Sequence, residues 1–197
     1  MSKYDEMKKI RDEVVALKDS PLYEYRTKNN YHPVLGEGSH DAAILFIGEA
    51  PGRNEAIQGR PFVGQAGKLL DQMLEKNGIS RSDVYITNIV KDRPPENRDP
   101  LPSEIESYGP FLDRQIDIIQ PKVIATLGRF SYAYIMKKFD QDLFIEPISK
   151  AHGSVVDATA SYGPIKIVPL YHPAAAIYNQ KLKDTLFKDF EILKQFV

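Results

Sequence analysis

The sequence predicts an α/β fold in which helices cover both faces of a parallel β-sheet. Four short apolar segments rich in β-branched residues alternate with segments of helical periodicity. Two of them, 43–47 and 123–127, are apolar at nearly every position, as strands buried on both faces are. Polar or glycine-rich residues follow each apolar segment directly, so they should meet at the carboxyl edge of one sheet, where such folds bind ligands.

Helices and strands are predicted to alternate along the chain, beginning and ending with a helix. The helix at 66–77 is favoured by leucine and methionine side chains spaced three or four residues apart, and Gly78 should end it. The predicted strands cover residues 43–47, 84–87, 123–127 and 165–170, and the predicted helices cover residues 4–17, 66–77, 102–119, 130–139 and 181–196.

The segments between these elements are predicted in less detail. The helix at 102–119 should begin with a capping box formed by Ser103 and Glu106. Residues 91–102 contain four prolines and are predicted to form a stiff loop. Residues 140–162 are expected to form a hairpin or a loop.

The composition favours a soluble, cytoplasmic protein formed by a single domain, residues 1–197. Apolar residues make up 42% and charged residues 27% of the chain, as in ordinary globular proteins. No apolar run approaches the roughly 18 residues of a membrane span. The charged N-terminus has no apolar core of a signal peptide, which favours the cytoplasm.

The absence of cysteine excludes disulfides, thiolate catalysis and cysteine-ligated metal sites. The four histidines lie far apart in the sequence and form no HExxH or HxH pair, so neither a metal nor another cofactor is expected. The net charge of −1 does not indicate a polyanionic partner, but local basic patches can still bind one. Basic residues near the motifs form either such a patch or dispersed surface charge: Arg53, Arg60, Lys91, Arg93, Arg98, Arg129 and Lys181.

A glycine-rich turn, GEAPG at residues 48–52, follows the first predicted strand. Gly48 and Gly52 allow the backbone to approach a ligand closely, and backbone N–H groups there can bind an anion. The carboxylate of Glu49 would repel a phosphate. Unless Glu49 is a solvated loop residue, it is better suited to stabilising a positive charge or holding a water molecule.

Three further residues carry candidate chemistry. Phe62, within the glycine-rich loop at 59–67, offers a flat face for stacking a base, unless it anchors the loop in the core. Asn88 ends a predicted strand, and its amide can read the edge of a pyrimidine, although asparagine is also a common turn residue. His172 follows the last predicted strand, where it can donate to a developing oxyanion or cap the sheet.

Together these motifs resemble the family 4 uracil-DNA glycosylases of the uracil-DNA glycosylase superfamily. The resemblance extends from about Pro21 to the C-terminus. It implies the fold of that family, a three-layer α/β/α sandwich with a four-stranded parallel central sheet. It rests on four ordered segments: GEAPGRNE at 48–55, GRPFVG at 59–64, TNIVKDRPP at 87–95 with Asn97 and Arg98, and HPAAA at 172–176.

The resemblance implies a role for each matching residue. Glu49 and His172 match the catalytic pair, with His172 near uracil O2. Phe62 matches the aromatic residue that stacks on uracil, Asn88 the residue that reads it, and Glu55 a pocket residue tied to specificity. The implied uracil-binding set is Gly48, Ala50, Pro51, Gly52, Glu55, Phe62 and Asn88, and the implied DNA-contacting set is Arg60, Pro173, Ala174, Ala175, Ala176 and Ile177.

The sequence departs from the family at an iron–sulfur cluster that four cysteines normally hold. The matching positions here are Leu17, Ser20, Asp92 and Tyr108, none of which is a usual ligand. We therefore expect no cluster. We expect Leu17 and Tyr108 to fill its space with an apolar contact, and Ser20 and Asp92 to hydrogen-bond there.

The expected activity is hydrolysis of the N-glycosidic bond of uracil in single- or double-stranded DNA, by a monomer and through base flipping. No lysine nucleophile is apparent in the motifs, so no strand cleavage is expected. One alternative is a catalytically weak DNA-binding member of the fold. Another is a glycosylase for hypoxanthine or xanthine. A third, a small-nucleotide-binding protein, is disfavoured because GxGxxG and a Walker lysine are missing.

Overall fold

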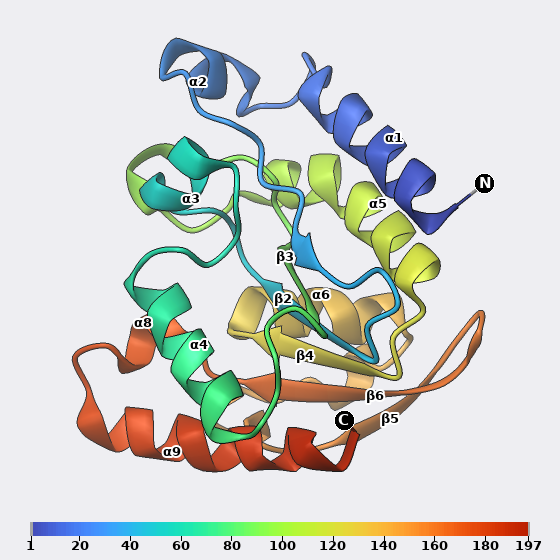
Figure 1. Cartoon of the computed structure of the whole chain (residues 1–197), viewed down its shortest axis with the longest axis vertical. Coiled ribbons are helices and arrows are strands. Elements are labelled where there is room, and N and C mark those ends of the chain that lie inside the picture. The colour runs from blue at the N-terminus through green and yellow to red at the C-terminus, as the bar shows by residue number, and fades with distance from the viewer. Residues whose placement is uncertain (1, 197) are drawn as a thin grey trace.

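The fold is built on one mixed sheet of six strands in the order β1-β3-β2-β4-β6-β5 (Figure 1). The computed structural model describes residues 2–196. The strands are β1 (Glu37–Gly38), β2 (Ile44–Gly48), β3 (Tyr85–Asn88), β4 (Val123–Leu127), β5 (Val156–Ala160) and β6 (Gly163–Leu170).

The sheet has six strands rather than the four expected. The four inner strands, β3, β2, β4 and β6, run parallel, while β1 and β5 pair antiparallel at the two edges. Strand β1 is two residues long, too short to produce a sequence pattern. Strand β5 lies within the segment 140–162 and pairs with β6 as a hairpin, from Val156 opposite Ile167 to Ala160 opposite Gly163.

Helices cover both faces of the sheet. On one face α1, α5 and α6 pack against alternate side chains of β2 and β4, including Leu45 and Ile124. On the other face α4 and α9 pack against the intervening side chains, including Phe46 and Ala125. The helices are α1 (Lys3–Val15), α2 (Tyr23–Lys28), α3 (Arg53–Gln58), α4 (Gln65–Lys76), α5 (Pro102–Ile119), α6 (Arg129–Lys138), α7 (Ile148–Ala151), α8 (Pro173–Ala176) and α9 (Gln180–Phe190).

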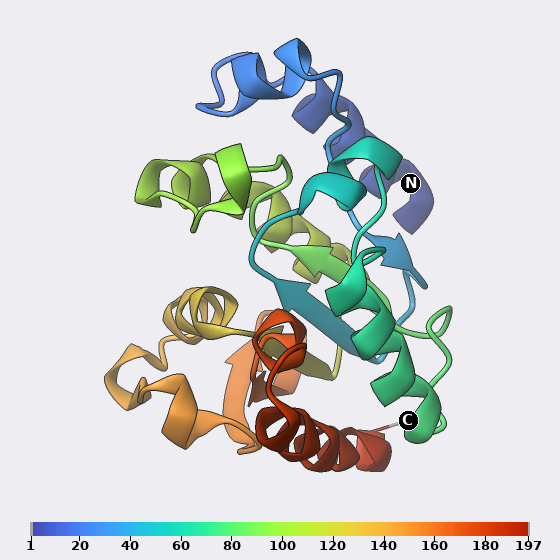
Figure 2. The ribbon, with the colours of Figure 1, turned by 90° about the vertical axis from the view of Figure 1, so that its left-hand side faces the viewer.

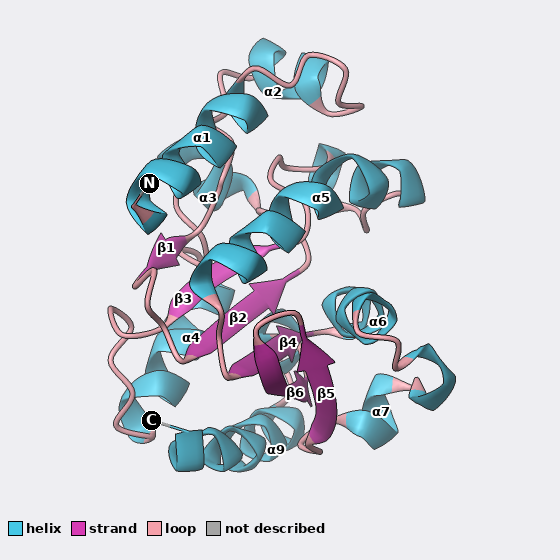
Figure 3. Ribbon diagram, turned by 90° about the vertical axis from the view of Figure 1, so that its right-hand side faces the viewer, coloured by secondary structure: helices cyan, strands magenta, loops and turns pink. Residues whose placement is uncertain are grey.

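The N-terminal helices and the C-terminal helix α9 lie on opposite sides of the fold (Figure 2). Figure 2 shows the blue N-terminal helices at one end of the molecule and the red helix α9 at the other. Figure 3 shows α1 and α5 side by side over the sheet. No helix within residues 2–196 is long and apolar enough to cross a membrane.

Two predicted helix ends differ from the structure. The capping box expected at Ser103 and Glu106 is wrong, because α5 begins at Pro102 and the Glu104 carboxylate accepts the N–H of Leu101 at 2.8 Å. The predicted helix at 181–196 divides into α9 and a 3₁₀ turn, Glu191–Phe196. Further 3₁₀ turns cover Pro95–Asn97 and Asp142–Phe144.

Candidate active site

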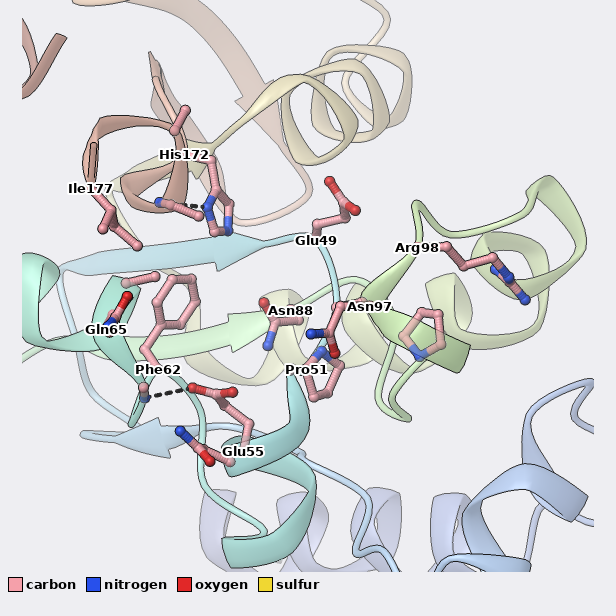
Figure 4. A pocket seen from close by; sticks show the side chains of 18 residues that line it. Glu49, Pro51, Glu55, Phe62, Gln65, Asn88, Asn97, Arg98, His172 and Ile177 are labelled. Atoms are coloured by element: carbon pink, nitrogen blue, oxygen red, sulfur yellow. Dashed lines mark hydrogen bonds between the residues drawn. The ribbon is translucent and has the colours of Figure 1, made fainter. Parts of the chain in front are cut away.

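A pocket of about 620 Å³ lies at the carboxyl edge of the parallel strands, where the polar segments converge. It is bounded by the turn after β2, the loop before α4, the end of β3, the loop before α5 and helix α8. Figure 4 shows the predicted residues of four separate segments directed toward this one space. Its walls include Glu49, Ala50, Pro51, Gly52, Asn54, Glu55, Phe62, Gly64, Gln65, Asn88, Pro94, Asn97, Arg98, His172, Ala174, Ala175 and Ile177.

Phe62 has an unusual backbone conformation, and its ring packs closely against neighbouring residues of the pocket wall. Its φ angle is 49°, in the left-handed region, and its ring lies 5.7 Å from the His172 ring at an interplanar angle of 28°. A Cβ atom added to Gly48 would come within 2.7 Å of the Phe62 ring and 2.3 Å of Asn88 Oδ1. Gly48 is not among the residues that line the pocket, but a side chain at this position would displace Phe62 and Asn88, which do line it.

Asn88 lies at the end of β3 with its amide directed into the pocket (Figure 4). The residue is 2% exposed, and among residues 2–196 its Oδ1 has no hydrogen-bond partner. A buried carbonyl oxygen without a partner costs about 1–3 kcal/mol. Such an atom at a pocket wall is placed to accept a hydrogen bond from a ligand.

His172 is held as a neutral hydrogen-bond donor at the start of α8. Its Nδ1 accepts the N–H of Ala174 at 3.1 Å, so this nitrogen carries no hydrogen. Burial lowers the pKa of His172 to about 4. The neutral ring therefore carries its hydrogen on Nε2, which is the tautomer needed to donate to an oxygen in the pocket.

Glu49 stands half-buried directly after β2. Burial, with a smaller contribution from the negative charge of Asp99, raises the pKa of Glu49 to about 7, and the positive charge of Arg129 opposes this shift. Asp99 and Arg129 form an exposed ion pair with a distance of 2.5 Å. Glu49 can therefore change its charge near neutral pH.

Glu55 orders the loop that carries Phe62. Its Oε1 accepts the N–H groups of Val63 at 2.9 Å and Gly64 at 2.8 Å. A Cβ atom on Gly52 would lie 2.7 Å from Oε2 of Glu55. One carboxylate oxygen of Glu55 is thus occupied by the loop, while the side chain still forms part of the pocket wall.

The residues expected to contact DNA divide into three groups. Ala174, Ala175 and Ile177 line the pocket mouth. Pro173 and Ala176 are buried, and Ala176 packs into the core below α8. Arg60 lies outside the pocket wall and pairs with Glu37 through two hydrogen bonds of 2.8 Å.

Several functional candidates were not found from the sequence. Tyr178 directly follows the pocket-lining Ile177 and is 91% exposed. Asn97 and Arg98 belong to the motif at 87–98, but nothing in the sequence predicted that they line the pocket, as they do in the structure. Lys91 was grouped with surface cations, yet it is fully buried.

The four positions matched to cluster cysteines contain a buried polar network instead. Tyr108 Oη donates to Asp92 Oδ2 at 2.5 Å and lies 2.6 Å from Ser20 Oγ. Arg26, which is 5% exposed, donates to Asp92 Oδ2 at 3.0 Å and to the carbonyl oxygen of Val14 at 3.1 Å. We call Ser20, Arg26, Asp92 and Tyr108 the polar network.

The polar network corrects the expected packing and does not fit an iron–sulfur cluster. Ser20 and Asp92 do hydrogen-bond here, but Tyr108 contributes its hydroxyl group as well as its ring. Leu17 is partly buried against the core. A cluster needs anionic thiolate ligands, whereas this space holds an arginine cation and side-chain oxygens already paired with one another.

Comparisons with known proteins agree with this site. The family model described as the uracil DNA glycosylase superfamily matches residues 35–193. A type-4 uracil-DNA glycosylase of Sulfurisphaera tokodaii is 47% identical over 192 residues, covering 97% of this chain and 84% of the relative. One from Archaeoglobus fulgidus is 47% identical, covering 85% of this chain and 82% of the relative.

A more distant relative extends over nearly the whole of both chains. The type-4 uracil-DNA glycosylase of Thermotoga maritima is 39% identical over 195 residues, covering 97% of this chain and 94% of its own. With the pocket at the carboxyl edge of the sheet and the family match across it, the chain belongs to the uracil DNA glycosylase superfamily, and within it to the type-4 enzymes.

Proposed function

We propose that this protein hydrolyses the bond between uracil and deoxyribose in DNA as a monofunctional glycosylase. The observation that carries the proposal is the unpartnered amide oxygen of Asn88, buried beside the rings of Phe62 and His172 in one pocket. The names of the type-4 relatives support the same activity.

Recognition begins with a nucleotide rotated out of the DNA stack, at a cost of a few kcal/mol. Phe62 stacks on the extruded uracil. The Asn88 Oδ1 accepts from uracil N3–H and the Nδ2 donates to O4. Cytosine reverses both polarities, so two buried groups would lose their partners, at about 1–3 kcal/mol each.

Thymine is excluded by the wall around its 5-methyl group. We assign this role to Glu55 and the neighbouring backbone. The support is that Glu55 ties the turn at Gly52 to the loop at Val63 and Gly64, which makes that wall stiff. A stiff wall cannot move aside for a methyl group without losing these hydrogen bonds.

Bond cleavage places negative charge on uracil and positive charge on the sugar. The Nε2–H of neutral His172 donates to uracil O2 as the negative charge develops. The carboxylate of Glu49 faces the positive C1′ and orients the attacking water. Lys91 Nζ is enclosed by protein and cannot reach C1′, and no lysine of residues 2–196 lines the pocket, so we expect no Schiff base and an abasic site as the product.

The DNA duplex is opened from the pocket mouth. Ala174, Ala175 and Ile177 form the apolar wedge in the minor groove, and the exposed ring of Tyr178 extends it. Single-stranded DNA is also a substrate, since it needs no wedge. The working unit is a single domain, residues 1–197, acting as a monomer in the cytoplasm.

The test is release of uracil from single- and double-stranded oligonucleotides, followed by alkali and gel electrophoresis. The wild-type protein should release uracil without cleaving the strand before alkali, and borohydride should trap no covalent product. A double variant, Glu49→Gln with Asn88→Ala, should be inactive. Wild-type turnover by the double variant would reject the site.

Two alternatives make different predictions in this assay. A catalytically weak DNA-binding protein of this fold would bind the oligonucleotide and release no base. A glycosylase for hypoxanthine or xanthine would prefer those bases in direct competition with uracil. The acceptor of Asn88 fits the N3–H of uracil, and the names of the type-4 relatives support uracil over the purines.

A further inference from the structure

Lys91 is a fully buried lysine whose side chain hydrogen-bonds to the backbone of Asn88, the residue proposed to recognise uracil. Its side chain is 0% exposed. Its Nζ donates to the main-chain oxygen of Asn88 at 2.7 Å, to Thr87 Oγ1 at 2.8 Å and to Gln115 Oε1 at 2.6 Å. The lysine thus joins the end of β3, at the pocket, to the C-terminal half of α5.

Hydrogen-bond accounting indicates that Lys91 is an ammonium ion. Thr87 donates its hydroxyl hydrogen to the carbonyl oxygen of Leu35 at 2.6 Å, so Oγ1 accepts from the lysine. Gln115 Nε2 donates to the same carbonyl at 2.9 Å, which orients Oε1 toward the lysine. Three acceptors surround Nζ, and only an ammonium group has three hydrogens to offer them.

This positive charge has no anionic partner among residues 2–196. Burial is the cause that lowers the pKa of Lys91 to about 7, and no carboxylate raises it. The adjacent Asp92 is paired with Arg26 instead. An isolated buried charge is costly, and an anion arriving nearby would reduce that cost.

We infer that Lys91 holds Asn88 in place and supplies the positive charge that balances the uracil anion during bond cleavage. The inference rests on the proposed glycosylase function. As C1′–N1 breaks, its electron pair stays with uracil and spreads over N1, O2 and O4. Water adds to C1′ and loses its proton to Glu49 or solvent. Lys91 transfers no proton and does not touch the base, so it is a positioning residue.

The test compares two leaving groups of similar size. The 5-fluorouracil anion is intrinsically more stable than the uracil anion, so it needs less help from the protein. Lys91→Met should lower kcat for uracil by about 100-fold, as loss of one charge-stabilising group does. The loss with 5-fluorouracil should be several-fold smaller. Equal losses with both bases would overturn the electrostatic role and leave only a structural one.

If Lys91→Met does not fold, a second variant can test whether the positive charge of Lys91 matters. Gln115→Glu places a carboxylate against Nζ and neutralises the charge without removing the lysine. It should lower kcat more for uracil than for 5-fluorouracil. Gln115→Met removes the hydrogen bonds of the Gln115 side chain to Lys91 and Leu35 without adding a charge and should affect both bases equally. If the two variants show the same base dependence, the inference fails.

Because the chain has no cysteine, Lys91 can also be rebuilt chemically. Lys91→Cys introduces a single thiol, which is alkylated with 2-bromoethylamine in denaturant before refolding. The added amine should restore most of the activity, whereas alkylation with neutral iodoacetamide should not. Equal recovery with both reagents would contradict the inference. A wild-type protein that releases no uracil would instead reject the proposed function itself.

Discussion

Two buried polar regions lie close together in the sequence, one at Asn88, which ends β3, and one at Asp92, four residues later, and they differ in whether their polar groups have hydrogen-bond partners. In the pocket, the Asn88 oxygen has no partner among residues 2–196. In the polar network, Asp92 accepts from both Tyr108 and Arg26. An unpartnered buried group is costly unless a ligand pairs with it, whereas a fully partnered network stabilises the fold.

The comparison also separates two adjacent charges. Lys91 donates to neutral oxygens, and Asp92 is paired with an arginine. We therefore expect changes near Lys91 to alter catalysis and changes near Asp92 to alter stability.

Removing the anion of the polar network should cause the largest loss of stability. Asp92→Ala leaves the buried Arg26 without a counter-ion, and breaking a buried pair in this way costs about 3–5 kcal/mol. Urea denaturation measures the free energy of unfolding. At low temperature, the folded fraction should release uracil at the wild-type rate. A variant of wild-type stability, or a folded variant with little activity, would contradict the claim that Asp92 serves stability and not catalysis.

Removing the pocket carboxylate should have the opposite result. Glu49→Gln should lower kcat by about 100- to 1000-fold, because water is no longer oriented and the positive sugar is not stabilised. The melting temperature should not fall, since a carboxylate that is costly to bury has been removed. Glu75→Gln, on the exposed face of α4, is the matched control and should change neither property.

A smaller change separates the hydroxyl group of Tyr108 from its ring. Tyr108→Phe keeps the apolar volume but leaves Asp92 with one donor fewer, which should cost about 1–3 kcal/mol of unfolding free energy. Uracil release should be unchanged. Wild-type stability would mean that the buried ring, rather than the hydrogen bonds, holds this region together.

The pH dependence of kcat should follow the ionisation of Glu49. Glu49 acts as a carboxylate, and its pKa is raised to about 7. Below that pH it is protonated, so kcat should rise about tenfold per pH unit as the pH increases toward 7. Since the pKa of His172 is lowered to about 4, it stays neutral throughout this range. The rising limb should be absent in Glu49→Gln; its persistence there would assign it to another group.

Much of the fold could be predicted from the sequence, because burial leaves a local pattern. Segments with apolar residues at nearly every position form β2 and β4, and the segment with regularly spaced leucines forms α4. The edge strand β1 was not predicted, and β5 lies in the segment 140–162, for which the sequence predicted only a hairpin or a loop. Strand β1 is too short for a pattern, and β5 is half-exposed and owes its conformation to pairing with β6.

The family, the residue types of the pocket and the absence of thiolate ligands can all be read from the amino-acid sequence, because they depend only on which residues occur in which order. Tertiary structure decided which polar groups found partners. Lys91 looked like a surface cation and is buried, Ala176 looked accessible and is in the core, and Arg26 gave no sign of pairing with Asp92. Partnering depends on which segments fold against one another, and residues 66 positions apart carry no local signal that they will meet.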